Sequence, residues 1–374
     1  MTTSIRFAGV ARYQESIRGL CGAILIALAM AIPARADSIG TYTLFAGHAI
    51  QATGGITATA GVIGSNGDMY LNGATAQTVR GGGSIFDVFG GVTTTGDVTV
   101  NGNAQLTFFG GIGGNLNVGQ NAYTSANVAG NIRAGNNVTT SGNTTGSIFA
   151  GGSITSTGTV SGSTNPFTAA NPTAFSNVAL PAAHAFSSGG TSLTLTSTQS
   201  LAPASYGGLV LNGATLNLTA GNYYFSDITM TGGATFNFNT TQGPINIYVT
   251  GSVYLNGPSM NLNGIAVSNV SSAATSQVYW ETHGNFRLDG NLLGTVYAPS
   301  GDIQVLGLST VNGDLIAGND LVITGGNFIT GTQSAALTVP EPAGLTLSLF
   351  ALAGLSFARW RKARRRHFPA AETG

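Results

Sequence analysis

The sequence predicts an all-β fold, specifically a right-handed parallel β-helix (solenoid) with coils of 16–19 residues. Three observations lead to this fold class. Glycines recur at a fixed spacing, apolar residues take the same positions in successive repeats, and Asn-Gly pairs that suit sharp corners recur along the body. Apolar runs near the two ends of the chain add a flanking N-terminal signal helix and a C-terminal transmembrane helix to the prediction.

The repeat is clearest in residues 114–161. Three consecutive sixteen-residue units begin with glycine: GNLNVGQNAYTSANVA, GNIRAGNNVTTSGNTT and GSIFAGGSITSTGTVS. Leu116, Ile132 and Ile148 occupy the same position in these units. A unit this short cannot bury a core alone, but it can form one coil of a solenoid whose coils stack about 4.8 Å apart. We therefore expect Ile132 to be buried between Leu116 and Ile148.

Related units occur elsewhere in the chain. GTVYAPSGDIQVLG from Gly294 and GDLIAGNDLVITGG from Gly313 begin nineteen residues apart. Asn-Gly pairs, which provide the left-handed backbone of sharp corners, occur seven times between residues 37 and 338. Such pairs also suit antiparallel hairpins, which are the rival interpretation. The in-register apolar columns favour the solenoid.

The domain organisation follows from where the repeats stop. Residues 37–162 form a first solenoid block and residues 205–338 a second one. Between them, residues 163–204 are rich in proline and alanine, which predicts a connection with room for one short capping helix.

Two resemblances support the solenoid. The units in residues 113–163 and those after Gly294 resemble bactofilin-type polymer-forming proteins. The stretch from GNYYFSDITMTGGATFNF to YWETHGNFRLDGNLLGTVYA is similar to bacterial ice-binding β-solenoids. These resemblances imply a stiff repetitive body that associates with itself or binds a ligand along its surface.

The N-terminus has the pattern of a secretion signal. Three arginines precede the apolar run GLCGAILIALAMAI, and the small-x-small triplet ARA follows it. We expect residues 1–36 to be the signal peptide and signal peptidase to cut after Ala36. An uncut N-terminal membrane anchor is the alternative. Because Cys21 is the only cysteine and lies in this segment, the mature body has no disulfide and no thiolate metal site.

The C-terminus, residues 339–374, has three parts in a fixed order. The tetrapeptide VPEP comes first, and residues 343–358 then form an apolar run that spans about 24 Å as a helix. A basic cluster follows, made of Arg359, Arg361, Lys362, Arg364, Arg365 and Arg366. Such a cluster stays on the cytoplasmic side and stops export.

This order of parts resembles a PEP-CTERM sorting signal, the tag of exosortase substrates in Gram-negative bacteria. The resemblance implies transient insertion in the inner membrane, followed by recognition and cleavage by exosortase near Pro340, Glu341 and Pro342. It also implies release to the cell surface or the medium, and an association with exopolysaccharide and biofilm material. A permanent C-terminal membrane anchor is the alternative.

The charge of the body excludes one class of function. Residues 37–338 contain three arginines, no lysine and ten acidic residues, a formal net charge of −7. Nucleic-acid binding depends on lysine and arginine to displace the counterions of phosphate groups. We therefore expect no nucleic acid among the partners.

Signals for chemistry are weak, and the prediction is a protein that is not an enzyme and holds no cofactor or metal. The body has no nucleophile elbow, phosphate loop or paired-histidine motif. GGGSIFDVF is close to a calcium-binding nonapeptide, but Asp87 has the wrong offset.

The strongest cluster of polar residues is in WETHGNFRLDG. On a single strand, five alternating residues would share one face: Glu281, His283, Asn285, Arg287 and Asp289. Such a face could act on a polysaccharide. The alternative, a solvated outer face without catalysis, is favoured.

Alternating threonines are the other candidate feature. Two trios occur, one made of Thr155, Thr157 and Thr159 and the other of Thr194, Thr196 and Thr198. A flat threonine face can order water against ice or lie along a glycan, but threonine also simply suits exposed strand positions.

Together these features predict an exported structural or adhesive protein of the cell surface or biofilm matrix. Its expected partners are signal peptidase, exosortase, and exopolysaccharide or further copies of itself. A carbohydrate- or ice-binding solenoid is the alternative function, and a polysaccharide-active enzyme is the second alternative.

Overall fold

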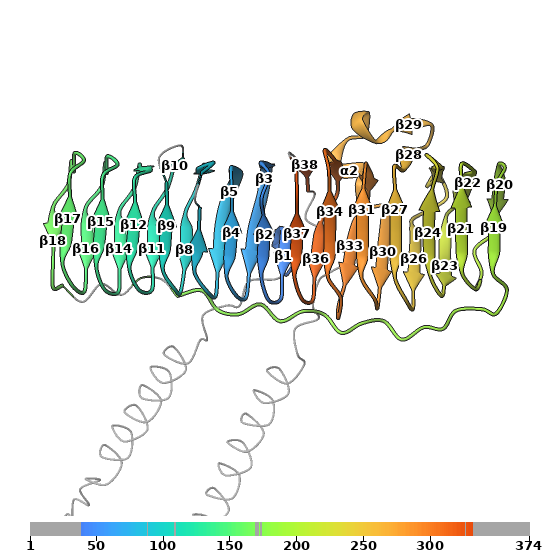
Figure 1. The fold of residues 1–374 in the computed structure, drawn as a ribbon, viewed down its shortest axis with the longest axis horizontal. Coiled ribbons are helices and arrows are strands. Elements are labelled where there is room, and N and C mark those ends of the chain that lie inside the picture. The colour runs from blue at the N-terminus through green and yellow to red at the C-terminus, as the bar shows by residue number, and fades with distance from the viewer. Residues whose placement is uncertain are drawn as a thin grey trace, which may run out of the picture. The chain divides into compact units, whose positions relative to one another are not determined.

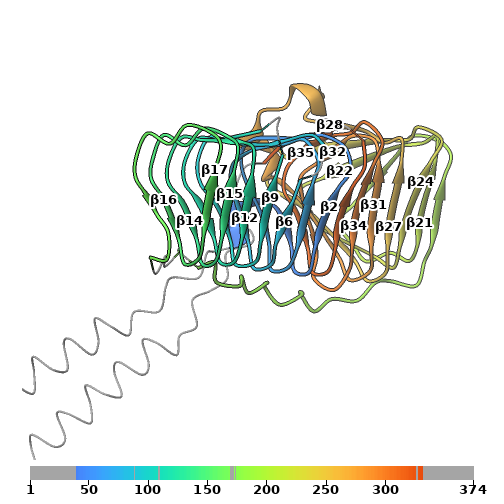
Figure 2. The same cartoon turned by 60° about the vertical axis from the view of Figure 1, so that its left-hand side comes forward.

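The computed structural model describes residues 39–331, apart from residues 88, 108–109, 169–171, 173 and 326. These residues form a parallel β-solenoid, as the sequence predicts (Figure 1). The predicted coil length of 16–19 residues is wrong for two coils of the second block, where Ile228 pairs with Val253 and Val253 pairs with Phe286, 25 and 33 residues further along the chain. Each full coil runs over three faces, which Figure 2 shows from an oblique angle. We name them the front face, the strap face and the third face.

The front face is one sheet of 14 strands, with one strand from each coil. In spatial order its strands are β17 (Ile154–Ser156), β15 (Val138–Thr140), β12 (Ala122–Thr124), β9 (Ala104–Leu106), β6 (Ile85–Phe86), β4 (Met69–Leu71), β2 (Ile50–Ala52), β37 (Leu321–Ile323), β34 (Ile303–Leu306), β31 (Phe286–Asp289), β27 (Val253–Asn256), β24 (Ile228–Thr231), β21 (Leu209–Asn212) and β19 (Leu193–Leu195).

The other two faces share the long strands β3 (Ile56–Ser65) and β5 (Ala74–Gly81), which run around a corner of the coil. The strap face also contains β18 (Thr164–Asn165), β16 (Ile148–Ala150), β14 (Ile132–Ala134), β11 (Leu116–Val118), β8 (Val98–Val100), β1 (Tyr42–Ala46), β36 (Leu315–Ala317), β33 (Thr295–Ala298), β30 (Val278–Thr282), β26 (Ile245–Val249) and β23 (Gly221–Phe225).

The third face also contains β13 (Asn127–Val128), β10 (Gly111–Ile112), β7 (Val92–Thr94), β38 (Asn327–Thr330), β35 (Thr310–Asn312), β32 (Leu292–Leu293), β29 (Ile265–Ala266), β28 (Ser259–Leu262), β25 (Thr235–Asn239), β22 (Thr215–Thr219) and β20 (Gln199–Leu201). Three short helices complete the described elements: η1 (Ile39–Thr41), η2 (Val267–Asn269) and α2 (Ser272–Thr275).

The order of the coils along the axis differs from their order in the sequence. The first block, β1–β18, starts in the middle of the solenoid and coils outward to one end (Figure 1). The chain then returns along the outside to the opposite end, where the second block, β19–β38, begins. The second block coils back to the middle and stacks on the first. From the β19 end of the axis, the coils of the second block therefore come first and those of the first block follow.

The two blocks join through parallel strand pairs on every face. On the front face Ile50 pairs with Leu321, and on the strap face Leu44 pairs with Leu315. On the third face β38 pairs with β3. The blocks thus form one continuous solenoid across a junction where the chain itself is not continuous. Because these strands pair among themselves, we expect residues 37–338 to fold as an isolated fragment.

The apolar columns of the sequence form the core. Ile132 pairs in parallel with Leu116 on one side and Ile148 on the other, and it is 0% exposed. This confirms the expected burial and the parallel arrangement of the three units. Among the described strand pairs, only β28 and β29 are antiparallel.

Polar ladders hold the corners of the coils. The backbone N–H and side-chain amide of Asn121 donate to Asn103 Oδ1 at 3.1 and 3.0 Å, and Asn137 donates likewise to Asn121 Oδ1 at 3.2 Å. Ser153 continues the ladder. Each side chain thereby satisfies a backbone donor of the next coil, which explains the asparagine in successive repeats.

Close approach of the coils explains most of the repeated glycines. A Cβ at Gly135 would collide with the carbonyl oxygen of Gly119 in the neighbouring coil. The glycine of five of the seven Asn-Gly pairs does have positive φ, as expected: Gly73, Gly213, Gly257, Gly264 and Gly313. At Gly67, a Cβ would instead collide with the carbonyl oxygen of His48, so stacking selects glycine there.

The connection between the blocks is an extended strap. Within the predicted connection, 163–204, β18 belongs to the first block and β19 and β20 belong to the second. The strap itself, residues 166–192, contains no helix among its described residues, so the short capping helix is not seen there.

The predicted signal helix in residues 1–36 and the transmembrane helix 343–358 lie outside the described residues. Among the residues that the structure does describe, no helix has the length and apolar character needed to cross a membrane.

Candidate binding face

The front face carries a single outward column in which each coil contributes one side chain. The strand pairings align these residues from the β19 end to the β17 end as Thr194, Val210, Thr229, Tyr254, Arg287, Gln304, Val322, Gln51, Tyr70, Phe86, Gln105, Tyr123, Thr139 and Thr155. Neighbours in the column are about 4.8 Å apart along the axis. The outward side chains therefore form a straight line of defined spacing.

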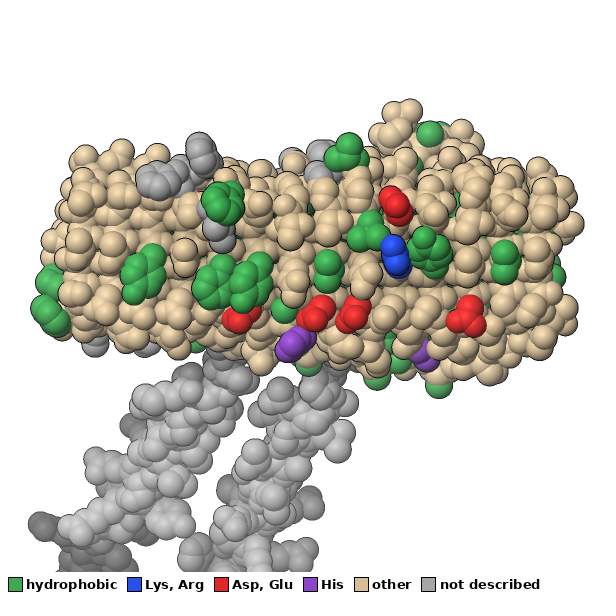
Figure 3. Space-filling model, in the orientation of Figure 1, with side chains coloured by type: hydrophobic (Ala, Val, Ile, Leu, Met, Phe, Trp, Pro, Cys, Tyr) green, Lys and Arg blue, Asp and Glu red, His purple; other side chains and the backbone are tan. Residues whose placement is uncertain are grey.

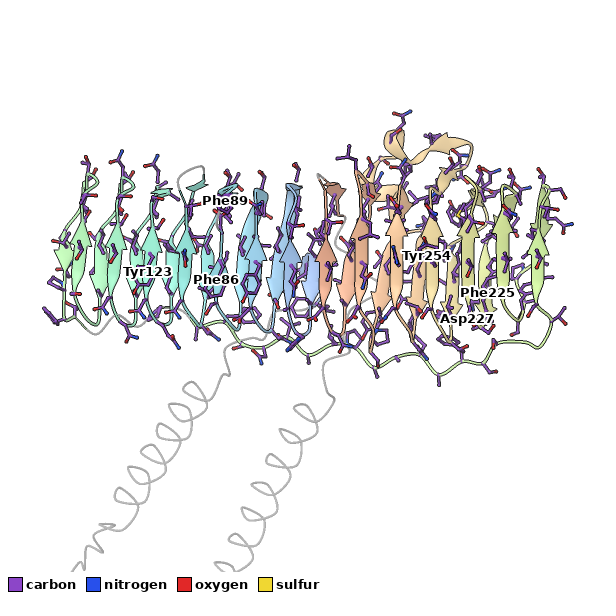
Figure 4. All side chains as sticks on the ribbon, viewed as in Figure 1. Phe86, Phe89, Tyr123, Phe225, Asp227 and Tyr254 are labelled. Atoms are coloured by element: carbon purple, nitrogen blue, oxygen red, sulfur yellow. The ribbon has the colours of Figure 1, made fainter. Side chains whose placement is uncertain are left out.

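Aromatic rings interrupt this column at three places. The rings of Tyr70 and Phe86 stack with their centroids 5.1 Å apart. Arg287 Cζ lies 5.2 Å from the centroid of the Tyr254 ring, a cation–π contact. Tyr123 is 47% exposed, as is Tyr70. Figure 4 labels Phe86, Tyr123 and Tyr254 on this face, and Figure 3 shows hydrophobic side chains in a row across it.

A shallow depression of about 290 Å³ lies beside Tyr123, across strands β9, β12, β15 and β17. Its lining consists of Gln105, Leu106, Tyr123, Thr124, Ser125, Thr139, Thr140, Ser141, Thr155 and Thr157. The lining therefore combines one aromatic ring with many hydroxyl groups and contains no charged side chain.

Acidic residues follow the edge of the front face, and most have a structural role at a corner. Asp68 Oδ1 accepts a hydrogen bond from the backbone N–H of Ser84 at 2.8 Å. Asp320 Oδ1 accepts one from Ala49 at 3.1 Å and lies 2.9 Å from His48 Nδ1. Figure 3 shows the acids spaced along this edge. In the described part of the chain, no three histidine, cysteine or acidic side chains are grouped so that they could hold a metal.

Asp87, in the nonapeptide-like stretch, has a structural role. Its side chain is buried and accepts hydrogen bonds from the backbone of Gly91 at 3.1 Å and the hydroxyl of Thr107 at 3.2 Å.

The polar cluster predicted on one strand is divided between two faces. WETHGNFRLDG forms β30 on the strap face and β31 on the front face, with a corner at Gly284. A Cβ at Gly284 would lie 2.6 Å from the carbonyl oxygen of Gly251 in the adjacent coil, so stacking favours glycine there. Arg287 and Asp289 are exposed on the front face, and Glu281 is buried. The predicted shared face of the five polar residues is therefore wrong, and so is the predicted exposure of Glu281.

The strap covers Glu281, which is 0% exposed. The backbone N–H of His184 donates to Glu281 Oε1 at 2.7 Å, and His184 Nδ1 lies 2.5 Å from Oε2. The Tyr279 hydroxyl donates to Oε2 at 2.8 Å, and His283 Nε2 lies 3.4 Å from Oε1. Burial, together with the Glu281 charge, raises the pKa of Tyr279, so its hydroxyl remains a neutral donor. Glu281 thus fastens the strap to the solenoid.

Further contacts fix the strap along its length. Asn101 exchanges two hydrogen bonds of 2.8 Å with the backbone of Phe175, and Asn66 pairs with the backbone of Val178 in the same way. The Tyr297 hydroxyl donates to the Pro181 carbonyl oxygen. These bonds explain why the strap keeps one path along the solenoid although its described residues form no strand.

The two threonine trios lie at opposite ends of the solenoid. Thr155 and Thr194 are the terminal members of the outward column, in β17 and β19. The other four threonines lie after these strands, outside the named elements, and are exposed: Thr157, Thr159, Thr196 and Thr198. The two trios therefore do not form one flat threonine array.

Comparisons with known proteins give a partial family match and distant similarities. Residues 194–270 match the family described as a domain of unknown function, DUF7305, which covers less than half of the chain. No curated protein matches the sequence.

Two solved structures are similar to the chain at low identity. One is a possible adhesin C-terminal domain from Caldicellulosiruptor kronotskyensis, 11% identical, with a TM-score of 0.31, covering 84% of this chain and 96% of that one. The other is an ice binding protein from an Antarctic bacterium of the Flavobacteriaceae, 12% identical, with a TM-score of 0.27, covering 78% and 97%. Values this low establish neither a shared family nor a shared function.

Proposed function

We propose that the protein is an exported structural or adhesive protein of the cell surface or biofilm matrix. The observation that carries this proposal is the front face, an uninterrupted sheet of 14 strands with a line of outward-facing side chains, most of them aromatic, amide or hydroxyl. A rigid face with one contact group per coil suits repeated weak contacts with an extended partner. In this proposal the partner is matrix polysaccharide.

Adhesion is tested with the fragment 37–338 coupled to beads and exposed to purified matrix polysaccharide. Beads that carry the folded fragment are expected to retain the polysaccharide, and beads that carry the heat-unfolded fragment are not. Equal retention by both bead types, or retention by neither, contradicts the adhesive function.

The proposal includes export and exosortase processing, supported by the signal pattern that ends at Ala36 and by the VPEP, apolar run and basic cluster of the tail. Replacing Pro340, Glu341 and Pro342 by alanine is expected to leave export intact. The protein should then accumulate in the inner membrane with its tail attached. Immunoblots of membrane and surface fractions measure this in a Gram-negative host that contains exosortase. Release of the triple variant at the wild-type level contradicts exosortase processing.

Self-association is a second candidate, and the junction between the blocks favours it. There, two coils that are not consecutive in the chain stack without a covalent link. The end strands β17 and β19 each have one neighbour in the front sheet, and residues 134–226 contain no lysine, arginine or acidic residue. Open edges without repelling charge are templates for pairing. In head-to-tail stacking of copies, β17 of one copy would lie beside β19 of the next, in the same parallel arrangement as β2 and β37 at the internal junction.

The two end residues of the outward column provide a test of this stacking. In a head-to-tail filament, Thr155 of one copy would adjoin Thr194 of the next, about 4.8 Å away. Lysine at both positions is expected to prevent filaments through like-charge repulsion, whereas Thr155→Lys combined with Thr194→Glu is expected to preserve them. Light scattering and electron microscopy compare the two double variants with the wild type. Identical behaviour of the two variants contradicts this mode of association.

The proposal assigns no catalytic activity. Its support is that both carboxylate oxygens of Glu281 are engaged by the strap and by Tyr279.

A further inference from the structure

The outward column changes sharply in side-chain size at Tyr123. From Tyr70 to Tyr123 its members are aromatic or glutamine, and the two coils beyond Tyr123 have Thr139 and Thr155. The depression of about 290 Å³ lies over this step. Because Tyr123 is 47% exposed, its ring forms a wall beside a lower shelf of threonines.

The chemistry of the lining matches one class of ligand. A sugar ring has an apolar C–H surface that packs on an aromatic ring, and hydroxyl groups around its rim that need hydrogen-bond partners. Tyr123 offers the aromatic ring, and Gln105, Thr139 and Thr155 offer exposed donors and acceptors. The volume is at the small end of the range for ligand sites, which suits one or two sugar units.

We propose that this depression binds a sugar ring of an uncharged linear glycan, stacked on Tyr123. The inference rests on the proposed adhesive function and deepens it by naming the site and the ligand class.

Charge favours a neutral glycan over an acidic one. No charged side chain lines the depression, whereas Asp68, Asp227, Asp302 and Asp320 follow the edge of the same face. Arg287 is the only cation in the outward column, and it is seven coils from Tyr123, about 34 Å away. Polyuronates and nucleic acids would meet acidic groups without compensating cations.

The column also explains how a chain longer than one sugar would lie. Phe86 is two coils from Tyr123, about 10 Å along the axis, with Gln105 between them. Tyr70 extends the aromatic surface by one further coil. A glycan that lies along the axis can therefore contact a ring at intervals and an amide between the rings.

Affinity electrophoresis of the fragment 37–338 tests the site. Native gels contain a soluble linear neutral glucan, a linear neutral mannan, polygalacturonate or no polysaccharide. We expect retardation by at least one neutral glycan and none by polygalacturonate. Tyr123→Ala is expected to weaken binding about tenfold, because the stacked ring is lost. Thr139→Val, which keeps the shape but removes a hydroxyl, is expected to weaken binding about threefold.

Two control variants separate the site from general effects. Tyr123→Phe keeps the ring and is expected to bind within about twofold of the wild type. Val210→Ala shortens an exposed apolar residue of the same column at the far end of the face and should not change binding. Because the side chains of Tyr123 and Thr139 are exposed, all four variants should unfold at the wild-type temperature.

The outcomes distinguish the inference from the function on which it rests. Retardation that is unchanged in Tyr123→Ala, confined to polygalacturonate, or absent with both neutral glycans overturns the sugar site. If the beads still retain matrix polysaccharide in that case, the adhesive function stands and only the sugar site is lost. The neutral glycan should also be recovered at its original chain length, because the site binds without cutting.

Discussion

Replacement of Ile132 by aspartate is expected to unfold the first block of the solenoid. The side chain is 0% exposed and lies between Leu116 and Ile148, so the substitution buries a carboxylate without a partner. We expect a loss of about 3–5 kcal/mol of unfolding free energy. Chemical denaturation followed by far-UV circular dichroism measures this loss.

Two further variants define the cause. Ile132→Val removes one buried methyl group and is expected to cost about 1 kcal/mol. Thr139→Asp places the same carboxylate on the exposed column one strand further along the chain, where it should cost less than about 0.5 kcal/mol. Equal destabilisation by Ile132→Asp and Thr139→Asp contradicts burial as the cause.

Ile132→Asp is expected to destabilise the coils near residue 132 more than the coils of the second block. In a solenoid each coil contacts mainly its neighbours, so stability is close to a sum of local terms. The second block has its own stacked coils and meets the first through the junction at β37 and β2. Limited proteolysis of Ile132→Asp should therefore digest coils near residue 132 before those of the second block.

The coil repeat could be predicted because its evidence is local. Ile132 pairs with Leu116 on one side and with Ile148 on the other, and the three residues are also equivalent positions of consecutive units. Parallel stacking of consecutive coils turns a sequence period directly into contacts. The same reasoning misplaced the polar residues around Gly284, because alternation was read through a corner where the chain changes face.

The order of the coils could not be predicted, because the junction pairs residues that are far apart in sequence. Leu44 and Leu315 belong to different blocks, and nothing local marks them as partners. The contact between His184 and Glu281 is equally remote, and it converts an apparently exposed acid into a buried one.

The outward column could be predicted in part, unlike the order of the coils. Tyr70 and Tyr123 are the central residues of the short strands MYL and AYT, whose flanking residues point inward. Aligning the units by their inward positions would have identified both as outward-facing. Their place in a single line with Tyr254 required the junction, which only the structure provides.

Replacement of Glu281 by alanine is expected to release the strap. The carboxylate accepts hydrogen bonds from the backbone N–H of His184 and the hydroxyl of Tyr279, and both donors would lose their partner. Tyr279 is itself buried, so its unpaired hydroxyl adds to the cost. We expect a loss of about 3 kcal/mol of unfolding free energy, because the partners of a buried charge are left unsatisfied.

Release of the strap can be measured directly by proteolysis. Phe186 packs against Tyr248 and His283, with ring centroids 5.1 and 4.4 Å away, next to the Glu281 contacts. Chymotrypsin should therefore cut after Phe186 much faster in Glu281→Ala than in the wild type. Asp289→Ala, which removes an exposed acid from the adjacent strand β31, is the matched control and should not change the cleavage rate.

An intermediate variant tests the hydrogen bonds themselves. Glu281→Gln keeps the size of the side chain and one acceptor oxygen. Its NH2 group, however, would face a group that donates a hydrogen bond to the carboxylate in the wild type, either the backbone N–H of His184 or the hydroxyl of Tyr279. Cleavage after Phe186 should then be faster than in the wild type and slower than in Glu281→Ala. If all three proteins are cut at the same rate, the strap is held by its other contacts, those of Asn66, Asn101 and Tyr297, and Glu281 does not fasten it.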